Sequence, residues 1–166
     1  MINKYAFTNL FLKYLIPVLY AAMYYFLQVE PNDRSYWQVV ILLSGFYLGN
    51  LLLWADSKFL YNYYNELQTL PQQLITRSIV FLIAFVALSI FMITSSGNLI
   101  GVGMILGIGV SLALELWENK LQPELFHKKF LFQVKRTFTP IEITRLVLGF
   151  SGFVGIVGVY FLFSRF

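Results

Sequence analysis

Long apolar runs, separated by short polar breaks, divide the chain into five segments. Each run holds about 20 residues, the length that an α-helix needs to cross the hydrocarbon core of a membrane. The polar group Ser95–Asn98, for example, separates the third run from the fourth. The predicted spans are residues 10–28, 36–55, 74–95, 98–117 and 141–163. We therefore predict an all-α integral membrane protein, with residues 1–166 forming a single polytopic domain.

Helix-start signals precede two of these segments. Ser35, followed three residues later by Gln38, has the capping-box pattern that opens many helices. Thr139 and Glu142 repeat this pattern before the last segment, with Pro140 at the first helical position. Both signals support the expected starts of the second and fifth spans.

The loops after the second and fourth spans carry amphipathic patterns. Residues 57–69 place aromatic and leucine side chains at helical spacing, which predicts a short helix lying at the membrane interface. In the second loop, Phe126, Phe130 and Val134 would share one face of a helix. Alternation within residues 125–138 fits a strand equally well, so the periodicity leaves helix and strand open, and we favour a second interfacial helix.

The composition agrees with a lipid environment. The chain is 58% hydrophobic and 12% charged, whereas a soluble domain usually carries about 25% charged residues. The absence of cysteine excludes disulfides and thiolate metal sites. Because lipid tails are as apolar as leucine, small residues and polar pairs must drive the packing of the helices.

Small residues recur at every fourth position of the fourth span, and this stripe ends at Glu115. A helix advances ~100° per residue, so these positions lie within about 120° of one another. A similar stripe in the second span ends at Asp56. The residues expected to pack helices together are Gly45, Gly49, Gly103, Gly107, Ser111, Gly152 and Gly155.

The distribution of positive charges predicts the orientation of the chain. With five spans, ten of the 12 lysines and arginines fall on the side of the N-terminus and of the loops after the second and fourth spans. Positively charged short loops stay in the cytoplasm. We therefore expect a multi-pass protein of the plasma (inner) membrane, with a cytoplasmic N-terminus and an external C-terminus.

This orientation places five charged residues at one level. Asp56, Glu115 and Glu118 lie at the inner ends of spans, whereas Arg77 and Arg145 lie at the inner starts of spans. Charges at the edge of the hydrocarbon are costly unless they are paired or hydrated. The cluster is either a structural clamp, which we favour, or a cytoplasm-facing site for an ion, a proton or a polar substrate.

The second loop is the most basic stretch of the chain. Lys128, Lys129, Lys135 and Arg136 lie beside phenylalanines. On an anionic inner leaflet each such residue contributes ~1 kcal/mol of attraction. Docking of an acidic partner is the alternative. The net charge of +4 encodes orientation in this class of protein, and we expect no nucleic-acid partner.

Catalytic and metal-binding patterns are weak. The segment 149–152 resembles the G-x-S-G signature of rhomboid-type intramembrane serine proteases, but such enzymes need a histidine on a following span. The only histidine, His127, precedes the motif. One histidine beside Glu115 and Glu118 also lacks the Glu-x-x-His pairs of a di-metal site. We expect no catalytic residue, no metal and no cofactor.

These observations favour a structural or accessory subunit of a membrane assembly, in contact with membrane-protein partners or with further copies of itself. The alternative is a small transporter or channel whose cytoplasmic site contains the acids and arginines. A weaker alternative is a membrane-embedded enzyme acting on lipid. A dry lattice of acids and arginines would favour the subunit, and a water-filled cavity reaching Glu115 would favour the transporter.

Overall fold

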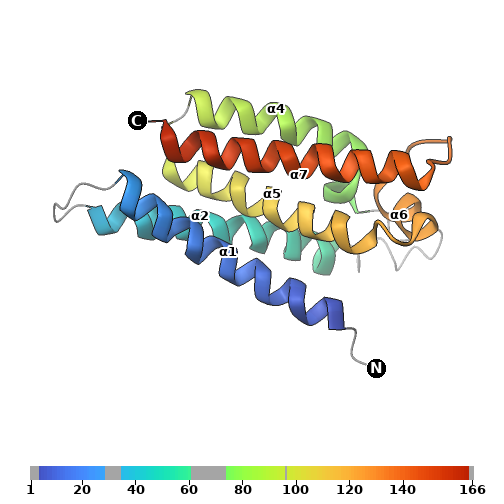
Figure 1. The fold of residues 1–166 in the computed structure, drawn as a ribbon, viewed down its shortest axis with the longest axis horizontal. Coiled ribbons are helices and arrows are strands. Elements are labelled where there is room, and N and C mark those ends of the chain that lie inside the picture. The colour runs from blue at the N-terminus through green and yellow to red at the C-terminus, as the bar shows by residue number, and fades with distance from the viewer. Residues whose placement is uncertain (1–3, 29–34, 61–73, 96, 165–166) are drawn as a thin grey trace.

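The computed structural model describes residues 4–28, 35–60, 74–95 and 97–164. Figure 1 shows a bundle of long helices in which the start of the first and the end of the last lie at opposite ends. The long helices are α1 (Lys4–Gln28), α2 (Ser35–Ala55), α4 (Ile79–Ser95), α5 (Leu99–Asn119) and α7 (Pro140–Phe163). The short elements are the π-helical turn η1 (Asp56–Leu60), the 3₁₀ turn η2 (Ile75–Arg77) and the helix α6 (Pro123–Phe130).

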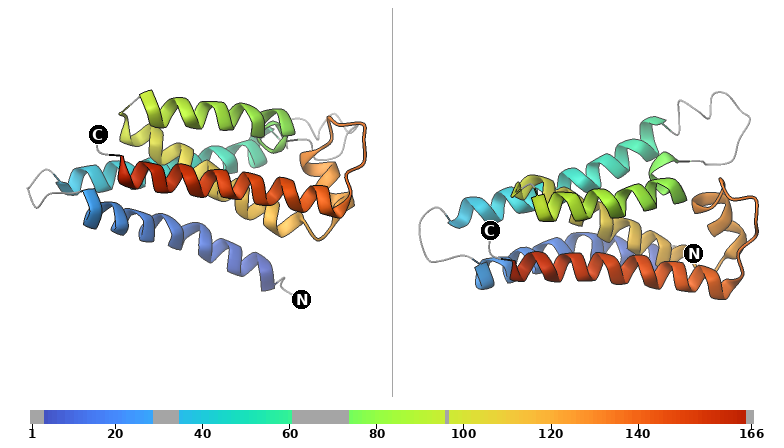
Figure 2. Two further views of the ribbon diagram at one scale, coloured as in Figure 1. Left: turned by 45° about the horizontal axis from the view of Figure 1, so that its top comes forward. Right: turned by 90° about the horizontal axis from the view of Figure 1, so that it is seen from above.

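Helix α5 occupies the centre of the bundle, because it contacts α1, α2, α4, α6 and α7. Figures 1 and 2 show α4 on the side of α5 opposite to α1. One core cluster, around Leu112 and Phe130, lies next to α6. A second cluster, around Phe46 and Phe161, lies farther along the bundle. The central helix thus brings residues from all parts of the chain together.

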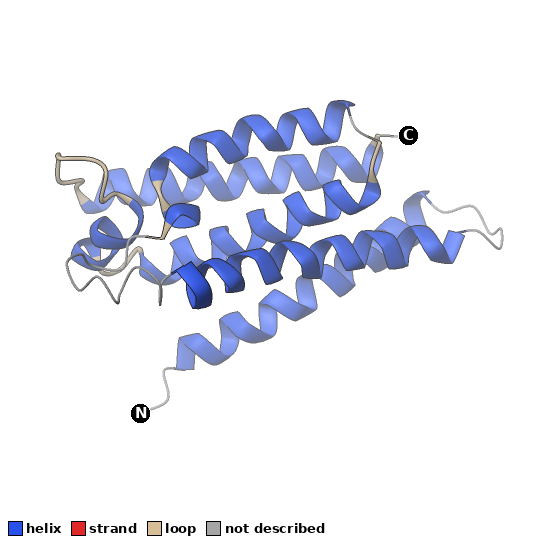
Figure 3. Cartoon of the chain, turned by 180° about the vertical axis from the view of Figure 1, so that it is seen from behind, coloured by secondary structure: helices blue, strands red, loops and turns tan. Residues whose placement is uncertain are grey.

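Every regular element in the described ranges is helical (Figure 3), so the all-α prediction is confirmed. Three helices, Tyr36–Lys58, Leu99–Asn119 and Pro140–Phe163, are long and apolar enough to cross a membrane. Leu12–Leu27 and Ile79–Ser95 are shorter apolar helices. These helices fit a membrane protein.

Large apolar side chains cover the outside of the bundle. Phe26, Trp37 and Ile156 expose 82%, 69% and 71% of their surface, respectively. A soluble monomer rarely leaves so much apolar surface in contact with water, whereas lipid tails cover such a surface at little cost. The exterior therefore supports the membrane assignment independently of helix length.

Side chains cap two of the long helices. The Thr139 hydroxyl accepts a hydrogen bond from the Glu142 amide at 3.3 Å, and the Glu142 carboxylate accepts one from the Thr139 amide at 2.8 Å. The capping box that the sequence predicts before the last span is therefore confirmed. Asn98 caps α5 through Ile100 and Gly101. Each cap satisfies amides that a helix leaves without an internal partner.

The two loop helices differ from expectation in different ways. The helix predicted over residues 57–69 falls mostly outside the described residues. In the second loop a helix does form, but it ends at Phe130, and the chain continues in turns rather than as a longer helix or a strand. The His127 ring lies 2.8 Å from the Arg136 carbonyl oxygen, which folds these turns back along α6. Phe126 and Phe130 pack inside the bundle instead of at the membrane surface.

The most extensive helix contact joins α2 to α5 through glycines. A Cβ atom at Gly103 would lie 3.0 Å from the Cα atom of Gly45, and one at Gly107 would lie 3.0 Å from that of Phe46. Gly49 likewise faces the backbone of α5. No side chain separates the two backbones here, so the small residues permit the close approach that is typical of membrane helices.

The glycines of α7 lie in a different environment. A Cβ atom at Gly152 or Gly155 would meet nothing within 4 Å among the described residues. Both are exposed, because α7 turns Val147 and Val154 toward the core instead. The structure therefore places neither glycine at a helix contact within the described chain, and their role in helix packing stays a prediction.

We expect Gly107→Ala to lower the free energy of unfolding by about 1–3 kcal/mol, because the added methyl group overpacks the α2–α5 contact. Gly149→Ala adds the same group where no described residue lies within 4 Å, and it serves as the matched control. Unfolding by SDS in mild detergent, followed by tryptophan fluorescence, measures both variants. Equal stability of the two would contradict the close backbone contact.

Candidate functional site

The strongest polar contact inside the bundle joins Arg77 to Glu115. The Arg77 Nε atom donates to Glu115 Oε2 at 3.1 Å, and Nη2 donates to Oε1 at 3.0 Å. Two parallel hydrogen bonds between a guanidinium and a carboxylate form the strongest type of side-chain ion pair. This pair fastens η2, just before α4, to the C-terminal part of α5.

The remaining guanidinium nitrogen of Arg77 faces the end of α2. Nη1 donates to the Leu53 carbonyl oxygen at 3.2 Å and to the Thr76 hydroxyl at 2.8 Å, and it lies 3.4 Å from Asp56 Oδ2. Asp56 Oδ2 also accepts from the amide and the hydroxyl of Thr76. All three nitrogens of the guanidinium group are therefore paired.

Two lysines complete the cluster. The Nζ atom of Lys13 on α1 lies 3.5 Å from Glu115 Oε1, and that of Lys129 on α6 lies 3.6 Å from Oε2. We call these residues the ionic network, which consists of Lys13, Asp56, Arg77, Glu115 and Lys129. Its three cations and two anions give a net charge of +1.

Local structure turns Arg77 inward. The Arg77 amide donates to the Leu74 carbonyl at 3.1 Å, which closes the 3₁₀ turn η2. Ser78 then starts α4, since its hydroxyl accepts from the Phe81 amide at 3.1 Å. This change from a 3₁₀ turn to an α-helix is why the third apolar helix begins at Ile79 rather than at residue 74.

Burial makes the pairing within the network obligatory. Asp56, Arg77 and Glu115 expose only 5%, 5% and 9% of their surface. Taking a charge out of water costs several kcal/mol, so a buried charge is retained only with partners. The network is thus buried at its centre, with the partly exposed lysines at its edge.

The network contains three of the five charges that the sequence placed at one level. Glu118 and Arg145 are exposed and lie outside it. Arg145 is two residues from the buried Ile143 and Val147, which puts it on the opposite side of α7.

Lys13 and Lys129 were missing from the predicted cluster. A lysine inside the apolar run 10–28 was the available signal for Lys13.

The four basic residues of the second loop separate in the structure. Lys128 and Lys135 are exposed, whereas Lys129 points toward Glu115. Arg136 pairs with Glu142 at 2.6 Å near the start of α7. Contact of these four residues with anionic lipid or with a partner stays a prediction. Lys128 and Lys135 are the two lysines exposed for such a contact.

Residues that could support chemistry elsewhere serve structural contacts. Ser151 of the G-x-S-G segment accepts a hydrogen bond from the Trp117 indole at 2.8 Å. The Ser111 hydroxyl contacts the side chain of Asn50 between α5 and α2. Within the described ranges, no group of three or more His, Cys, Asp or Glu side chains could hold a metal ion.

Comparison of the chain with known protein families, with curated proteins and with solved structures found no match in any of the three. The functional proposal therefore rests on the geometry of the site.

We expect Arg77→Met to lower the free energy of unfolding by about 3–5 kcal/mol, because it leaves two buried carboxylates without their main partner. Arg145→Met removes an exposed arginine and should change stability by less than about 0.5 kcal/mol. Adding Glu115→Gln to Arg77→Met should recover part of the loss. SDS titration in mild detergent measures all three, and equal stability of the two single variants would refute the role of the buried pair.

Proposed function

We propose that the protein is a structural or accessory subunit of an assembly in the plasma (inner) membrane. It crosses the membrane five times, with the N-terminus and the basic loop in the cytoplasm and the C-terminus outside. Its role is to hold a fixed bundle of helices against partner proteins or further copies of itself.

The observation that carries this proposal is the pairing at the centre of the ionic network. Arg77 is buried between Asp56 and Glu115, and all three of its nitrogens are paired. A transport site needs charged groups that release one partner to take up cargo. A buried lattice that joins α1, η1, η2, α5 and α6 instead suits a permanent clamp.

The five-span arrangement rests on helix length and on the position of the charges. At about 1.5 Å per residue, the apolar part of α1, Leu12–Leu27, spans about 24 Å, and the 17 residues of α4 span about 25 Å. A short span is accommodated by local thinning of the bilayer at modest cost. The network and the basic loop lie at the same end of the bundle. Positive charges gathered at one end are expected of a cytoplasmic end.

The outer face of α7 offers a surface for a partner helix. Gly152, Gly155 and Ile156 are exposed on this face. Small residues let a second membrane helix approach closely, and packing and polar contacts provide the attraction. Because these glycines have no neighbour among the described residues, their packing partner in this proposal is another chain.

Cysteine labelling tests the orientation, and the chain contains no native cysteine to interfere. We expect Lys128→Cys in intact cells to resist a membrane-impermeant maleimide until the membrane is opened. Ser95→Cys, at the other end of the bundle, should react from outside in the same cells. Reversed labelling of the two positions would overturn the proposed topology.

Purification in mild detergent, with mass spectrometry of the bound proteins, tests the subunit role. We expect a stoichiometric membrane protein, or a homo-oligomer, that is lost at least about tenfold in Gly155→Leu, because the side chain blocks a close helix contact. Ala22→Leu, on the exposed side of α1, is the matched control and should retain the partner. A monomer free of partners would refute the accessory role.

A further inference from the structure

Two lysines of the ionic network reach the surface of the bundle. The side chains of Lys13 on α1 and Lys129 on α6 expose 29% and 27% of their surface, whereas that of their shared partner Glu115 exposes 11%. Figures 1 and 2 show the N-terminal part of α1 and the helix α6 at the same end of the bundle. A ligand can therefore reach both ammonium groups from outside without entering the core.

Both ammonium groups keep hydrogen-bonding capacity. Their Nζ atoms lie 3.5 and 3.6 Å from Glu115, beyond the usual N–H···O distance of about 2.7–3.2 Å. The well-formed hydrogen bonds of this carboxylate come from Arg77 instead, at 3.1 and 3.0 Å. Among the described residues, no second carboxylate lies within 4 Å of either ammonium group. Each ammonium group carries three N–H donors, so both lysines have donors left for an acceptor from outside the chain.

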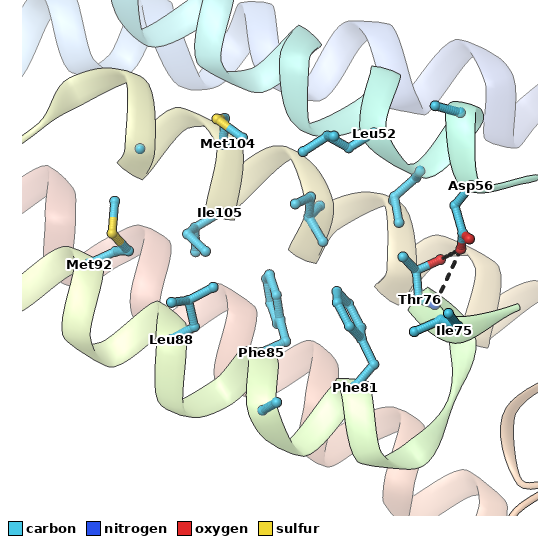
Figure 4. A pocket seen from close by; sticks show the side chains of 15 residues that line it. Leu52, Asp56, Ile75, Thr76, Phe81, Phe85, Leu88, Met92, Met104 and Ile105 are labelled. Carbon is cyan, nitrogen blue, oxygen red and sulfur yellow. Dashed lines mark hydrogen bonds between the residues drawn. The ribbon is translucent and has the colours of Figure 1, made fainter. Parts of the chain in front are cut away.

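The second acid of the network does not offset the charge of these lysines. An apolar groove of about 770 Å³ lies between α2 and α4 over α5, with Asp56 and Thr76 at one end (Figure 4). There Asp56 accepts from Thr76 and lies 3.4 Å from Arg77, and in the described ranges it forms no ion pair with a lysine. The excess charge of +1 in the network therefore lies on the side of Lys13 and Lys129.

An apolar helical surface begins at Lys13. This lysine is the second residue of the apolar stretch Leu12–Leu27, so its ammonium group lies near the edge of the hydrocarbon, close to the level of lipid phosphates. Met23 and Leu27 are exposed and lie within about 80° of Lys13 around the axis of α1, at ~100° per residue. A lipid whose head group contacts Lys13 can therefore place an acyl chain along α1.

The charge and the donors together select an anionic oxygen ligand. A phosphate group has oxygens that accept from two ammonium groups at once. Glu115 is the nearest acid, and Arg77 already matches its charge, which limits its repulsion of a bound anion. A zwitterionic head group would bring its own cation beside a network that is already positive, so an anionic phospholipid is the better ligand.

We propose that Lys13 and Lys129 bind the phosphate group of an anionic phospholipid at the edge of the bundle where α1 and α6 face Glu115. The acyl chains of this lipid lie along the exposed apolar side of α1. The site differs from a general attraction of the basic loop to the membrane, because it needs one lysine from each of two helices. The inference depends neither on the proposed subunit role nor on the proposed orientation, since binding in detergent tests it.

Native mass spectrometry of the full-length protein in a mild neutral detergent measures the binding of lipid. We expect phosphatidylglycerol to bind at least about fivefold more tightly than phosphatidylcholine, because choline adds a positive charge beside the network. Inorganic phosphate lacks acyl chains and should displace phosphatidylglycerol only at a far higher concentration. Equal binding of the two lipids, or displacement by inorganic phosphate at the concentration of the lipid, would overturn the proposal.

Lys13→Met and Lys129→Met locate the site. Each should weaken the binding of phosphatidylglycerol about fivefold, and the double variant should weaken it at least about tenfold, as expected for lysines near an anionic head group. Lys58→Met removes an exposed lysine of η1 that lies outside the network, so this matched control should bind lipid as the wild type does. Wild-type binding by the double variant would refute the site.

Lys13→Arg and Lys129→Arg separate binding from folding. An arginine keeps the positive charge and the N–H donors, so each variant should bind phosphatidylglycerol within about threefold of the wild type. SDS titration verifies that each variant is folded. Loss of binding in a folded arginine variant to the level of the methionine variant would contradict the contact with phosphate. If the methionine variants do not fold, the comparison of the two lipids on the wild-type protein decides the question.

Discussion

The rest of the structure depends on one buried arginine. The Arg77 guanidinium binds carboxylates from two different helical segments, and Glu115 in turn gathers Lys13 and Lys129 from two more. Lipid supplies no hydrophobic drive to bring helices together, so such contacts have a disproportionate influence on which helices become neighbours. The ionic network lies at one end of the bundle, whereas the α2–α5 glycine contact extends along its length.

The ionic network and the α2–α5 glycine contact together explain why an apolar groove lies between α2 and α4. Glycines bring α2 into backbone contact with α5, while α4 is attached near its start through Arg77 and rests on α5 and α7 through larger side chains. Helix α4 therefore cannot approach α2 closely, and the space between them stays open above α5. Asp56 lines one end of the groove and also belongs to the ionic network.

Local signals in the sequence predicted the helices well, because caps such as Thr139–Glu142 act over a few residues. The choice of partners was harder to predict. Lys128 and Lys129 are neighbours on α6, about 100° apart, so only the orientation of that helix decides which one reaches Glu115. Arg77 and Arg145 both lie near the starts of their predicted spans, but α7 buries its apolar side and leaves Arg145 outside. Helix α6 ends early, and the His127 ring contacts the Arg136 carbonyl oxygen in the turns that follow, a contact that periodicity does not encode.

Lys13 has a consequence for how the chain is made. Translation at about 5–20 residues per second produces Glu115 some 5–20 s after Lys13, because roughly a hundred residues separate the two. In the proposed topology, α1 enters the membrane during that interval while the ammonium group of Lys13 has no carboxylate partner. In this topology, snorkelling toward the head groups keeps such a lysine solvated and holds this part of α1 near the cytoplasmic face until the fourth apolar segment emerges.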